Sequence, residues 1–368
     1  MKSHKRIRVG VDARSLLCRE PRGEGKSLLR LYQEIRLQRP DIEAVFFGDH
    51  TTVDFRGELP QGISTTRIDL PGDRFSAWEN LYFPAAATMA RCNVLHCTSS
   101  GGPFWSPQPQ LLTVHDLIPA LFDDGLSEEA KVLFMKRLKN GLRNSKRIIT
   151  VSTHTRKDLL KTFHGLRTPI DVIHWGCDLA NTEEQAPPVD SPYVIAFGGE
   201  AKRKNTTFTL ERFFAVANAV PTLKLLLVGV SSKQHREELA QKALQAGLAD
   251  RVVLPGFVSE AELDGLIRNA SALLYLSLYE GFGLPLLEAI GRGVPVIASD
   301  CTSIPEILDG APGCFSLEST GAIEEAILSL VTNHMERERW QRAQSGVLPR
   351  FNWERTARQT IDALEYCT

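Results

Sequence analysis

Short apolar runs alternate with longer amphipathic stretches along most of the chain. The first half contains such runs, rich in Val, Ile, Phe and Leu, at residues 6–13, 43–48, 93–97, 110–116 and 147–152. Between them, residues 26–38 and 128–144 repeat their apolar positions at the spacing of an amphipathic helix. Strand-length runs that alternate with helices predict parallel α/β units.

The alternation stops in the middle of the chain and then begins again. Residues 178–193 are polar, contain three prolines and show no periodicity, so they are interpreted as a linker. Beyond them, apolar runs at 193–199, 223–229, 251–256, 272–277 and 295–299 alternate with helical patterns at 207–219, 232–247, 260–270 and 284–293. The pattern predicts two doubly wound α/β domains, each with a parallel sheet.

We expect the first domain over residues 1–180, the linker over 181–192 and the second domain over 193–350. Ligands of open parallel sheets bind beyond the carboxyl ends of the strands. Two such domains that face each other across a cleft would therefore place a ligand between their sheets.

Composition limits the class of protein. The chain has 368 residues, of which 43% are hydrophobic and 24% charged, which is ordinary for a globular protein with two cores. No apolar run approaches the ~20 residues of a membrane span, and the basic N-terminus lacks a secretory apolar core. We therefore expect a cytoplasmic protein.

The seven cysteines are scattered, odd in number and without a CxxC pair, which disfavours a disulfide framework and a structural zinc site. The segment Cys92–Cys97, "CNVLHC", could be taken for a metal cluster. Its ligand spacing is wrong for one, so a buried strand end is the preferred interpretation.

Charge is unevenly distributed. Residues 1–178 contain 26 basic and 20 acidic side chains, whereas the remainder contains 17 and 24. Within residues 131–167 there are eleven basic residues and a single acid, Asp158. Such a segment suits an anionic membrane surface or an anionic acceptor, and a solvated helix face is an equal alternative. It lacks the interleaved aromatic residues that would favour nucleic acid.

The stretch "REPRGEGKS", residues 19–27, resembles the end of a phosphate-binding P-loop. That motif requires a glycine five residues before its final Gly-Lys pair, and here the position is Glu20. Pro21 also removes a backbone N–H from the cradle. The sequence therefore disfavours a P-loop nucleoside triphosphatase and leaves a glycine loop before a helix, which suits an anion or is a plain turn.

The segment 277–300 contains the strongest candidate site. Gly281 and Gly283 allow close approach of the backbone to a ligand, and the helix predicted after them offers about half a positive charge at its N-terminus. Both features favour a phosphate. Glu280 and Glu288 accept hydrogen bonds and suit sugar and ribose hydroxyls. Together they predict a nucleotide-sugar site, with a tight turn and two surface glutamates as the alternative.

Further candidates follow other strands. Arg203 and Lys204, next to Lys202 in the basic triplet after the first strand of the second domain, can neutralise phosphate, although such triplets are usually solvated. His115 ends a strand of the first domain and can contact substrate oxygen or move a proton, although a lone histidine is more often structural. Glu79 could act as a base and is interpreted instead as a surface carboxylate.

These residues identify the chain as a member of a known family. The stretch "YEGFGLPLLEA" resembles the Glu-x7-Glu signature of the retaining family 4 glycosyltransferases. The likeness covers nearly the whole chain, and "VGVDARSLL", "TVHDLIP", "RIITVSTHTRKDLL", "RKN", "GFVSEAEL" and "GVPVIASDCTSIPEIL" follow in the family order. The resemblance implies the GT-B fold, two Rossmann-like domains that face each other across a cleft, with residues 351–368 as a helix that crosses back to the first domain.

The resemblance also implies roles for individual residues of the second domain. Glu280 would bind the donor sugar and Glu288 the ribose of the nucleotide. Arg203 and Lys204 would neutralise the leaving diphosphate. Backbone N–H groups would contact sugar and phosphate from four consecutive residues: Gly281, Phe282, Gly283 and Leu284.

The remaining contacts with the donor that the resemblance implies come from both halves of the chain. The backbone of Phe257 and Val258 would meet the base, Gly25 would approach the diphosphate from the first domain, and His115 would contact the sugar near its reacting carbon. Many members have an arginine where this chain has Gly199. The adjacent Arg-Lys-Asn form is common in mannosyltransferase-type members.

The implied activity is transfer of a hexose, mannose first, from a nucleoside-diphosphate sugar to an acceptor hydroxyl with retained anomeric configuration. GDP-mannose is the preferred donor and a UDP-sugar the second choice, with no metal and no cofactor. The acceptor would be a glycan or a lipid-linked glycan in polysaccharide, lipopolysaccharide or glycolipid assembly. The enzyme would then be peripheral at the inner face of a membrane. The alternative is a non-catalytic nucleotide-sugar- or glycan-binding protein of the same fold.

Overall fold

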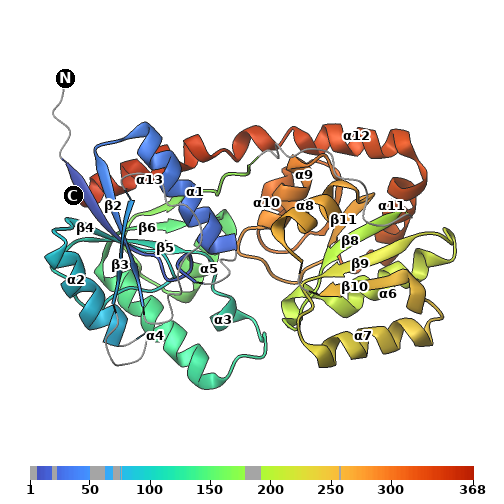
Figure 1. Ribbon diagram of the computed structural model, residues 1–368, viewed down its shortest axis with the longest axis horizontal. Coiled ribbons are helices and arrows are strands. Elements are labelled where there is room, and N and C mark those ends of the chain that lie inside the picture. Colours follow the sequence, from blue (N-terminus) through green and yellow to red (C-terminus); the bar gives the residue numbers. More distant parts are fainter. Residues whose placement is uncertain are drawn as a thin grey trace. The chain divides into compact units, whose positions relative to one another are not determined.

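The computed structural model describes residues 6–18, 23–49, 63–68, 75, 77–178, 192–256 and 258–368. The chain forms two compact units (Figure 1). The first comprises Met1–Leu121, Leu126–Gly176 and Phe351–Thr368, and the second comprises Phe122–Gly125 and Cys177–Arg350. The predicted linker falls almost entirely on residues 179–191, which lie outside the described residues.

The first unit contains a seven-stranded parallel sheet in the order β3-β2-β1-β4-β5-β6-β7. Its strands are β1 (Ile7–Asp12), β2 (Ile42–Gly48), β3 (Ile63–Arg67), β4 (Val94–Cys97), β5 (Gln110–Val114), β6 (Ser145–Thr150) and β7 (Ile170–Val172). Its helices are α1 (Gly23–Gln38), the π-helical turn η1 (Trp78–Tyr82), α2 (Phe83–Met89), α3 (Ile118–Leu121), α4 (Glu128–Asn144), α5 (Thr153–Thr162) and α13 (Trp353–Cys367).

The central strands of this sheet match the apolar runs because both of their faces are buried. The segment Cys92–Cys97 is confirmed as a buried strand end: His96 in β4 is 1% exposed and bonds Tyr32 Oη and Thr113 Oγ1, each at 2.8 Å. Burial lowers the pKa of His96 to about 3. The sequence pattern missed β3 and β7, because both are short edge strands with few apolar residues.

The second unit contains a six-stranded parallel sheet in the order β10-β9-β8-β11-β12-β13. Its strands are β8 (Tyr193–Phe197), β9 (Lys224–Val228), β10 (Val252–Gly256), β11 (Ala272–Tyr275), β12 (Val296–Ser299) and β13 (Cys314–Phe315). Its helical segments are η2 (Lys202–Lys204), α6 (Thr206–Ala217), α7 (Lys233–Gln245), η3 (Ala249–Arg251), α8 (Glu260–Arg268), α9 (Leu284–Gly291), α10 (Ile304–Leu308), α11 (Thr320–Thr332), α12 (His334–Ser345) and η4 (Leu348–Arg350).

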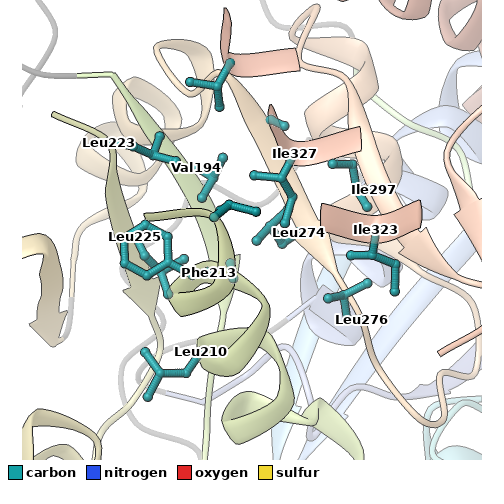
Figure 2. Close-up of a cluster of buried hydrophobic side chains, with 14 of the residues drawn as sticks. Val194, Leu210, Phe213, Leu223, Leu225, Leu274, Leu276, Ile297, Ile323 and Ile327 are labelled. Carbon is teal, nitrogen blue, oxygen red and sulfur yellow. The ribbon is translucent and has the colours of Figure 1, made fainter. Parts of the chain in front are cut away.

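The core of the second unit lies where α6 and α11 cover one face of the sheet (Figure 2). Val194, Leu225 and Leu274 come from three adjacent strands, and Phe213 of α6 and Ile327 of α11 pack against them. The strand order is that of a doubly wound fold. From β8, the chain adds β9 and β10 on one side and then β11, β12 and β13 on the other, so the switch point lies between β8 and β11. Loops that leave these two strands therefore meet at the point where ligands bind in such sheets.

Helix α13 belongs to the first unit, where it lies along α1 (Figure 1). Gln38 Nε2 of α1 donates to the carbonyl of Glu354 at 2.9 Å, and Thr356 Oγ1 donates to the carbonyl of His174 at 2.8 Å. These bonds join α13 to α1 and to the segment that follows β7. Among the described residues, none of the helices has the length and apolar content needed to cross a bilayer.

Candidate functional site

Opposite charges from two loops meet at the switch point of the second sheet. The loop after β8 contributes Arg203 and Lys204, and the loop after β11 contributes Glu280. Lys204 Nζ donates to Glu280 Oε1 at 2.7 Å, and Arg203 Nη1 lies 3.4 Å from Glu280 Oε2. The backbone N–H of Leu278 donates to the carbonyl of Arg203 at 2.7 Å. The two loops are thus bonded to each other through backbone and side chains.

Glu280 is held in place by several neighbours. Ser277 Oγ donates to its carboxylate at 2.8 Å, and its own backbone N–H donates to Thr302 Oγ1 at 3.0 Å. Lys204 lies over the ring of Tyr275, with Nζ 5.4 Å from the ring centroid. Burial, and then the charge of Glu280, raise the pKa of the Tyr275 hydroxyl well above its usual value. Sequence reasoning missed these supports, because Ser, Thr and Tyr at strand ends have no distinctive spacing.

The glycine turn before α9 has a fixed backbone. Gly283 has a φ of +121°, and a Cβ there would approach Ile307 Cδ1 to 2.9 Å, so only glycine fits without strain. Ser303 Oγ lies 3.0 Å from the carbonyl of Glu280 and 2.7 Å from that of Phe282. Helix α9 then begins at Leu284. The turn presents the N-terminus of this helix beside Glu280, which suits an anionic group.

The other predicted contacts of this unit are spread along the same edge. Glu288 lies in α9, and its negative charge contributes to the raised pKa of the Tyr275 hydroxyl. Val258 follows β10, two strands from β8 in the sheet. Phe257 lies outside the described residues. The structure therefore gathers Arg203, Lys204, Glu280 and the glycine turn, with Glu288 on the helix that follows.

A carboxylate from residues 122–125 already bonds one of these cations, Arg203. The backbone N–H and the side-chain Nε of Arg203 donate to the two carboxylate oxygens of Asp124, each at 3.1 Å. Its neighbour Asp123 bonds Lys202 at 2.7 Å. A backbone N–H together with a guanidinium is also what a phosphate oxygen would use. Sequence reasoning missed Asp124, because its segment is remote from both loops along the chain.

In the first unit, His115 lies in a recess that has both polar and aromatic walls. Its Nε2 lies 2.8 Å from the carbonyl of Thr98 and 3.5 Å from Glu24 Oε1, and its ring stacks on Trp175 with centroids 5.8 Å apart. Leu28, His96 and Thr113 complete the recess. An imidazole held between a carboxylate and an aromatic ring has a defined orientation, and the sequence did not reveal Glu24 or Trp175 as its partners.

The glycine loop of residues 23–27 is part of helix α1, which begins at Gly23. Gly25 is buried, and a Cβ there would lie 2.3 Å from the carbonyl oxygen of Ser15. The glycine is therefore required for packing, whatever it contributes to a ligand. Lys26 is exposed on the helix, and Glu20 and Pro21 lie outside the described residues.

The interpretation of Glu79 as a surface carboxylate was wrong. Its side chain is 2% exposed and bonds Arg14 at 3.0 Å and Arg137 at 2.7 Å. Arg14 also pairs with Asp12 at 2.6 Å, and its guanidinium carbon lies 4.0 Å from the Trp78 ring centroid. Burial opposes ionisation of Asp12, but Arg14 holds the pKa of that carboxyl below its usual value. Glu79 is therefore committed to a buried ion-pair cluster.

Two doubly wound parallel sheets, each with helices between its strands, define a GT-B α/β protein. The sequence models of two families match adjacent parts of the chain: "Glycosyltransferase Family 4" over residues 21–181 and "Glycosyl transferases group 1" over residues 180–345. The chain belongs to the family 4 type of glycosyltransferases, as the Glu-x7-Glu stretch predicted.

Two curated relatives are 27% and 29% identical to the chain over the segments that align with it. The O-antigen chain mannosyltransferase B of Escherichia coli is 27% identical over 239 residues, which cover 62% of each chain. The O-antigen chain mannosyltransferase RfbU of Salmonella typhimurium is 29% identical over 199 residues, which cover 54% of each. The matches thus span between half and two thirds of the length of these relatives.

A solved structure supports the fold over nearly the whole length. The Anabaena protein HepE, in complex with UDP and glucose, superposes with a TM-score of 0.74 at 16% identity, covering 98% of this chain and 99% of that one. At this identity the likeness establishes the fold alone.

Proposed function

We propose that this protein transfers a hexose, with mannose as the first candidate, from a nucleoside-diphosphate sugar to an acceptor hydroxyl and retains the anomeric configuration. The observation that carries the proposal is the convergence of Arg203, Lys204, Glu280 and the N-terminus of α9 at the switch point of one sheet. Its mannosyltransferase relatives favour mannose over other hexoses.

The cations would serve the leaving group. When the bond from the sugar anomeric carbon to the diphosphate breaks, negative charge grows on the phosphate oxygens. Arg203, Lys204 and the N–H groups at the start of α9 stabilise that charge without a metal, and fixed charges of this kind need little rearrangement during reaction. The acceptor oxygen then bonds to the anomeric carbon on the same face, and its proton passes to the departing phosphate oxygen.

The two glutamates would bind hydroxyls. Glu280 accepts from Lys204 and Ser277 in the structure, and carboxylate oxygens have further lone pairs for a sugar hydroxyl. Glu288, farther along α9, suits the ribose. In the first unit, His115 has a defined orientation beside Glu24 and Trp175, and we assign it to the sugar near its reacting carbon.

Nucleotide binding provides the first test. Thermal unfolding would be measured with GDP, UDP, ADP and CDP, and the matching nucleotide at 100 times its Kd should stabilise the protein by about 2.7 kcal/mol. We expect GDP to give the largest shift and UDP the second largest. Lys204→Ala should abolish the shift, whereas Lys202→Ala, at an exposed neighbour, should keep it. No shift with any of the four nucleotides would overturn the donor site.

Turnover distinguishes an enzyme from a binding protein. Labelled GDP-mannose and UDP-hexoses would be supplied with lipid-linked oligosaccharide acceptors, with and without EDTA, and the linkage of any product determined by NMR. We expect an α-linked mannoside in both conditions. Nucleotide binding without transfer to any acceptor would favour the non-catalytic alternative, and an inverted linkage would contradict retention.

A further inference from the structure

An exposed aromatic pair protrudes from the first unit. Phe104 and Trp105, in the loop between β4 and β5, are 62% and 67% exposed. Large aromatic side chains normally bury most of their surface. Two adjacent ones in water therefore mark a surface that has a use outside the fold.

The backbone beneath this pair is held firmly on two sides. The N–H of Phe104 donates to Asn80 Oδ1 at 2.7 Å, and its carbonyl accepts from Asn144 Nδ2 at 2.7 Å. Farther along the loop, Gln108 Nε2 donates to Thr88 Oγ1 at 2.8 Å. The loop is thus bonded to η1 and α2 on one side and to the end of α4 on the other. The backbone that carries the two exposed side chains is therefore anchored to the fold.

The helical segment beside the loop adds apolar surface. Leu81, Ala85 and Met89 are exposed and follow one another at four-residue intervals, so they share a face of η1 and α2. Met89 is 85% exposed. This face adjoins the stripe of Asn80 and Thr88, whose side chains bond the loop. The apolar surface therefore extends from the aromatic pair along α2.

The helix on the other side of the loop adds positive charge. Lys136, Lys139 and Arg143 are exposed and lie three and four residues apart, on one face of α4. The end of this face adjoins Asn144, which bonds Phe104. The chain contains no acidic residue from Ala130 to Lys157. This face therefore has no carboxylate from its own helix beyond the first turn.

We infer that Phe104, Trp105 and the Lys136–Arg143 face of α4 form a docking surface for an anionic lipid bilayer. Tryptophan at a membrane interface places its ring among the headgroups, exposed aliphatic side chains enter the acyl boundary, and the cations meet anionic headgroups. Only part of the basic segment 131–167 belongs to this surface. Arg137 forms a buried ion pair with Glu79, and the cations of α4, not those of α5, lie next to the aromatic pair.

Vesicle flotation tests the surface with the full chain. Vesicles of phosphatidylcholine alone and with 30% phosphatidylglycerol would be compared for the unaltered protein and its variants. We expect binding to the anionic vesicles only, reduced at least tenfold by Phe104→Ser with Trp105→Ser, and similarly by the triple change Lys136→Gln, Lys139→Gln, Arg143→Gln. Equal binding to both vesicle types, or none, would overturn the inference.

Matched controls separate this surface from general charge and apolarity. Arg156→Gln, Lys157→Gln and Lys161→Gln change three exposed cations of α5, and Leu244→Ser changes an exposed leucine of the second unit; both should leave vesicle binding within twofold. Lipids with bromine in the acyl chain should quench Trp fluorescence, and Trp105→Phe should remove most of that quenching. Equal losses with the α5 variant would assign the effect to net charge and reject the surface.

A glycan is the other ligand that stacks on exposed aromatic rings. If Trp105→Ser abolished binding of soluble oligosaccharide and left vesicle binding unchanged, the surface would belong to a glycan and the membrane assignment would be wrong. The inference stands apart from the proposed transfer, because nucleotide-dependent stabilisation of the Trp105→Ser variant reports the donor site independently of vesicle binding.

Discussion

Each unit contains a group of two carboxylates and two cations, and the two groups differ in their access to water. The group in the first unit, which we call the closed cluster, consists of Asp12, Arg14, Glu79 and Arg137. Its side chains are between 2% and 11% exposed. In the second, the open cluster of Asp124, Arg203, Lys204 and Glu280 is between 10% and 23% exposed. The balance of charge is the same in both.

The difference teaches how to separate a structural ion-pair group from a functional one. The closed cluster is walled by aromatic rings: Arg14 lies over Trp78 and Arg137 over Phe75. Loss of one partner there leaves a buried charge without compensation. The open cluster can exchange a carboxylate for another anion, because its cations retain contact with solvent. Burial, more than the presence of charged residues, therefore separates the structural cluster from the one to which we assign the proposed binding.

The largest effect is expected in the closed cluster. Glu79→Ala leaves Arg14 and Arg137 without a shared partner and should lower the free energy of unfolding by about 3–5 kcal/mol. Urea denaturation followed by Trp fluorescence reports this unit, which contains four of the five tryptophans. Glu43→Ala, at an exposed pair with Arg8, should cost about 0–1 kcal/mol. A loss below about 1 kcal/mol for Glu79→Ala would show that the cluster is not closed.

The open cluster should respond in activity rather than stability. On the proposed function, Lys204→Ala removes a charge next to the leaving diphosphate and should lower kcat about 10²–10³-fold, with little change in unfolding. Steady-state kinetics with saturating donor checks this. Lys202→Ala serves as the control, because its exposed ammonium bonds Asp123 outside the cluster. If both variants lost activity equally, the assignment of Lys204 would fail.

Acid should weaken the first unit through His96. Its pKa is about 3 in the folded protein against a usual 6.5, so the unfolded chain binds the extra proton first. Stability is full above about pH 6.5 and falls below it by about 1.4 kcal/mol per pH unit, or roughly 3 kcal/mol by pH 4.5. Urea unfolding between pH 4.5 and 7 checks this, and His96→Gln should flatten the slope.

The smallest expected effect concerns Asp124. If a diphosphate must displace this carboxylate from Arg203, Asp124→Asn should tighten nucleotide binding by about tenfold, or about 1.4 kcal/mol. Isothermal titration calorimetry measures the change, and Asp123→Asn should leave affinity nearly constant. Weaker binding by Asp124→Asn would mean that Asp124 positions Arg203 for the nucleotide, and the two clusters would then be more alike than their exposure suggests.

The sequence predicted the α/β class, the central strands and the two loops of the open cluster. It could do so because strands buried on both faces are continuous apolar runs, and because parallel strands place their following loops at one edge. It did not predict the edge strands β3 and β7, whose side chains are largely polar or few. Neither did it reveal Asp124, since its pairing with Arg203 joins residues 79 positions apart.

Glu79 shows a different limit. Its local sequence, "SAWEN", has no feature that separates a surface carboxylate from a buried one. The distinction arises only when Arg14 from the end of β1 and Arg137 from α4 converge on it. Contacts between three separate elements are a property of the tertiary structure, and spacing along the chain does not encode them.

The chain passes from one compact unit to the other four times: after Leu121, Gly125, Gly176 and Arg350. A hybrid that joined residues 1–176 of this protein to the second half of a relative would therefore exchange more than a donor site. It would set Asp124 of one protein against the arginine of another, and would attach a foreign α13 to α1. Recombination that respects the units must move three segments together, which makes the two halves poor modules for engineering by a single crossover.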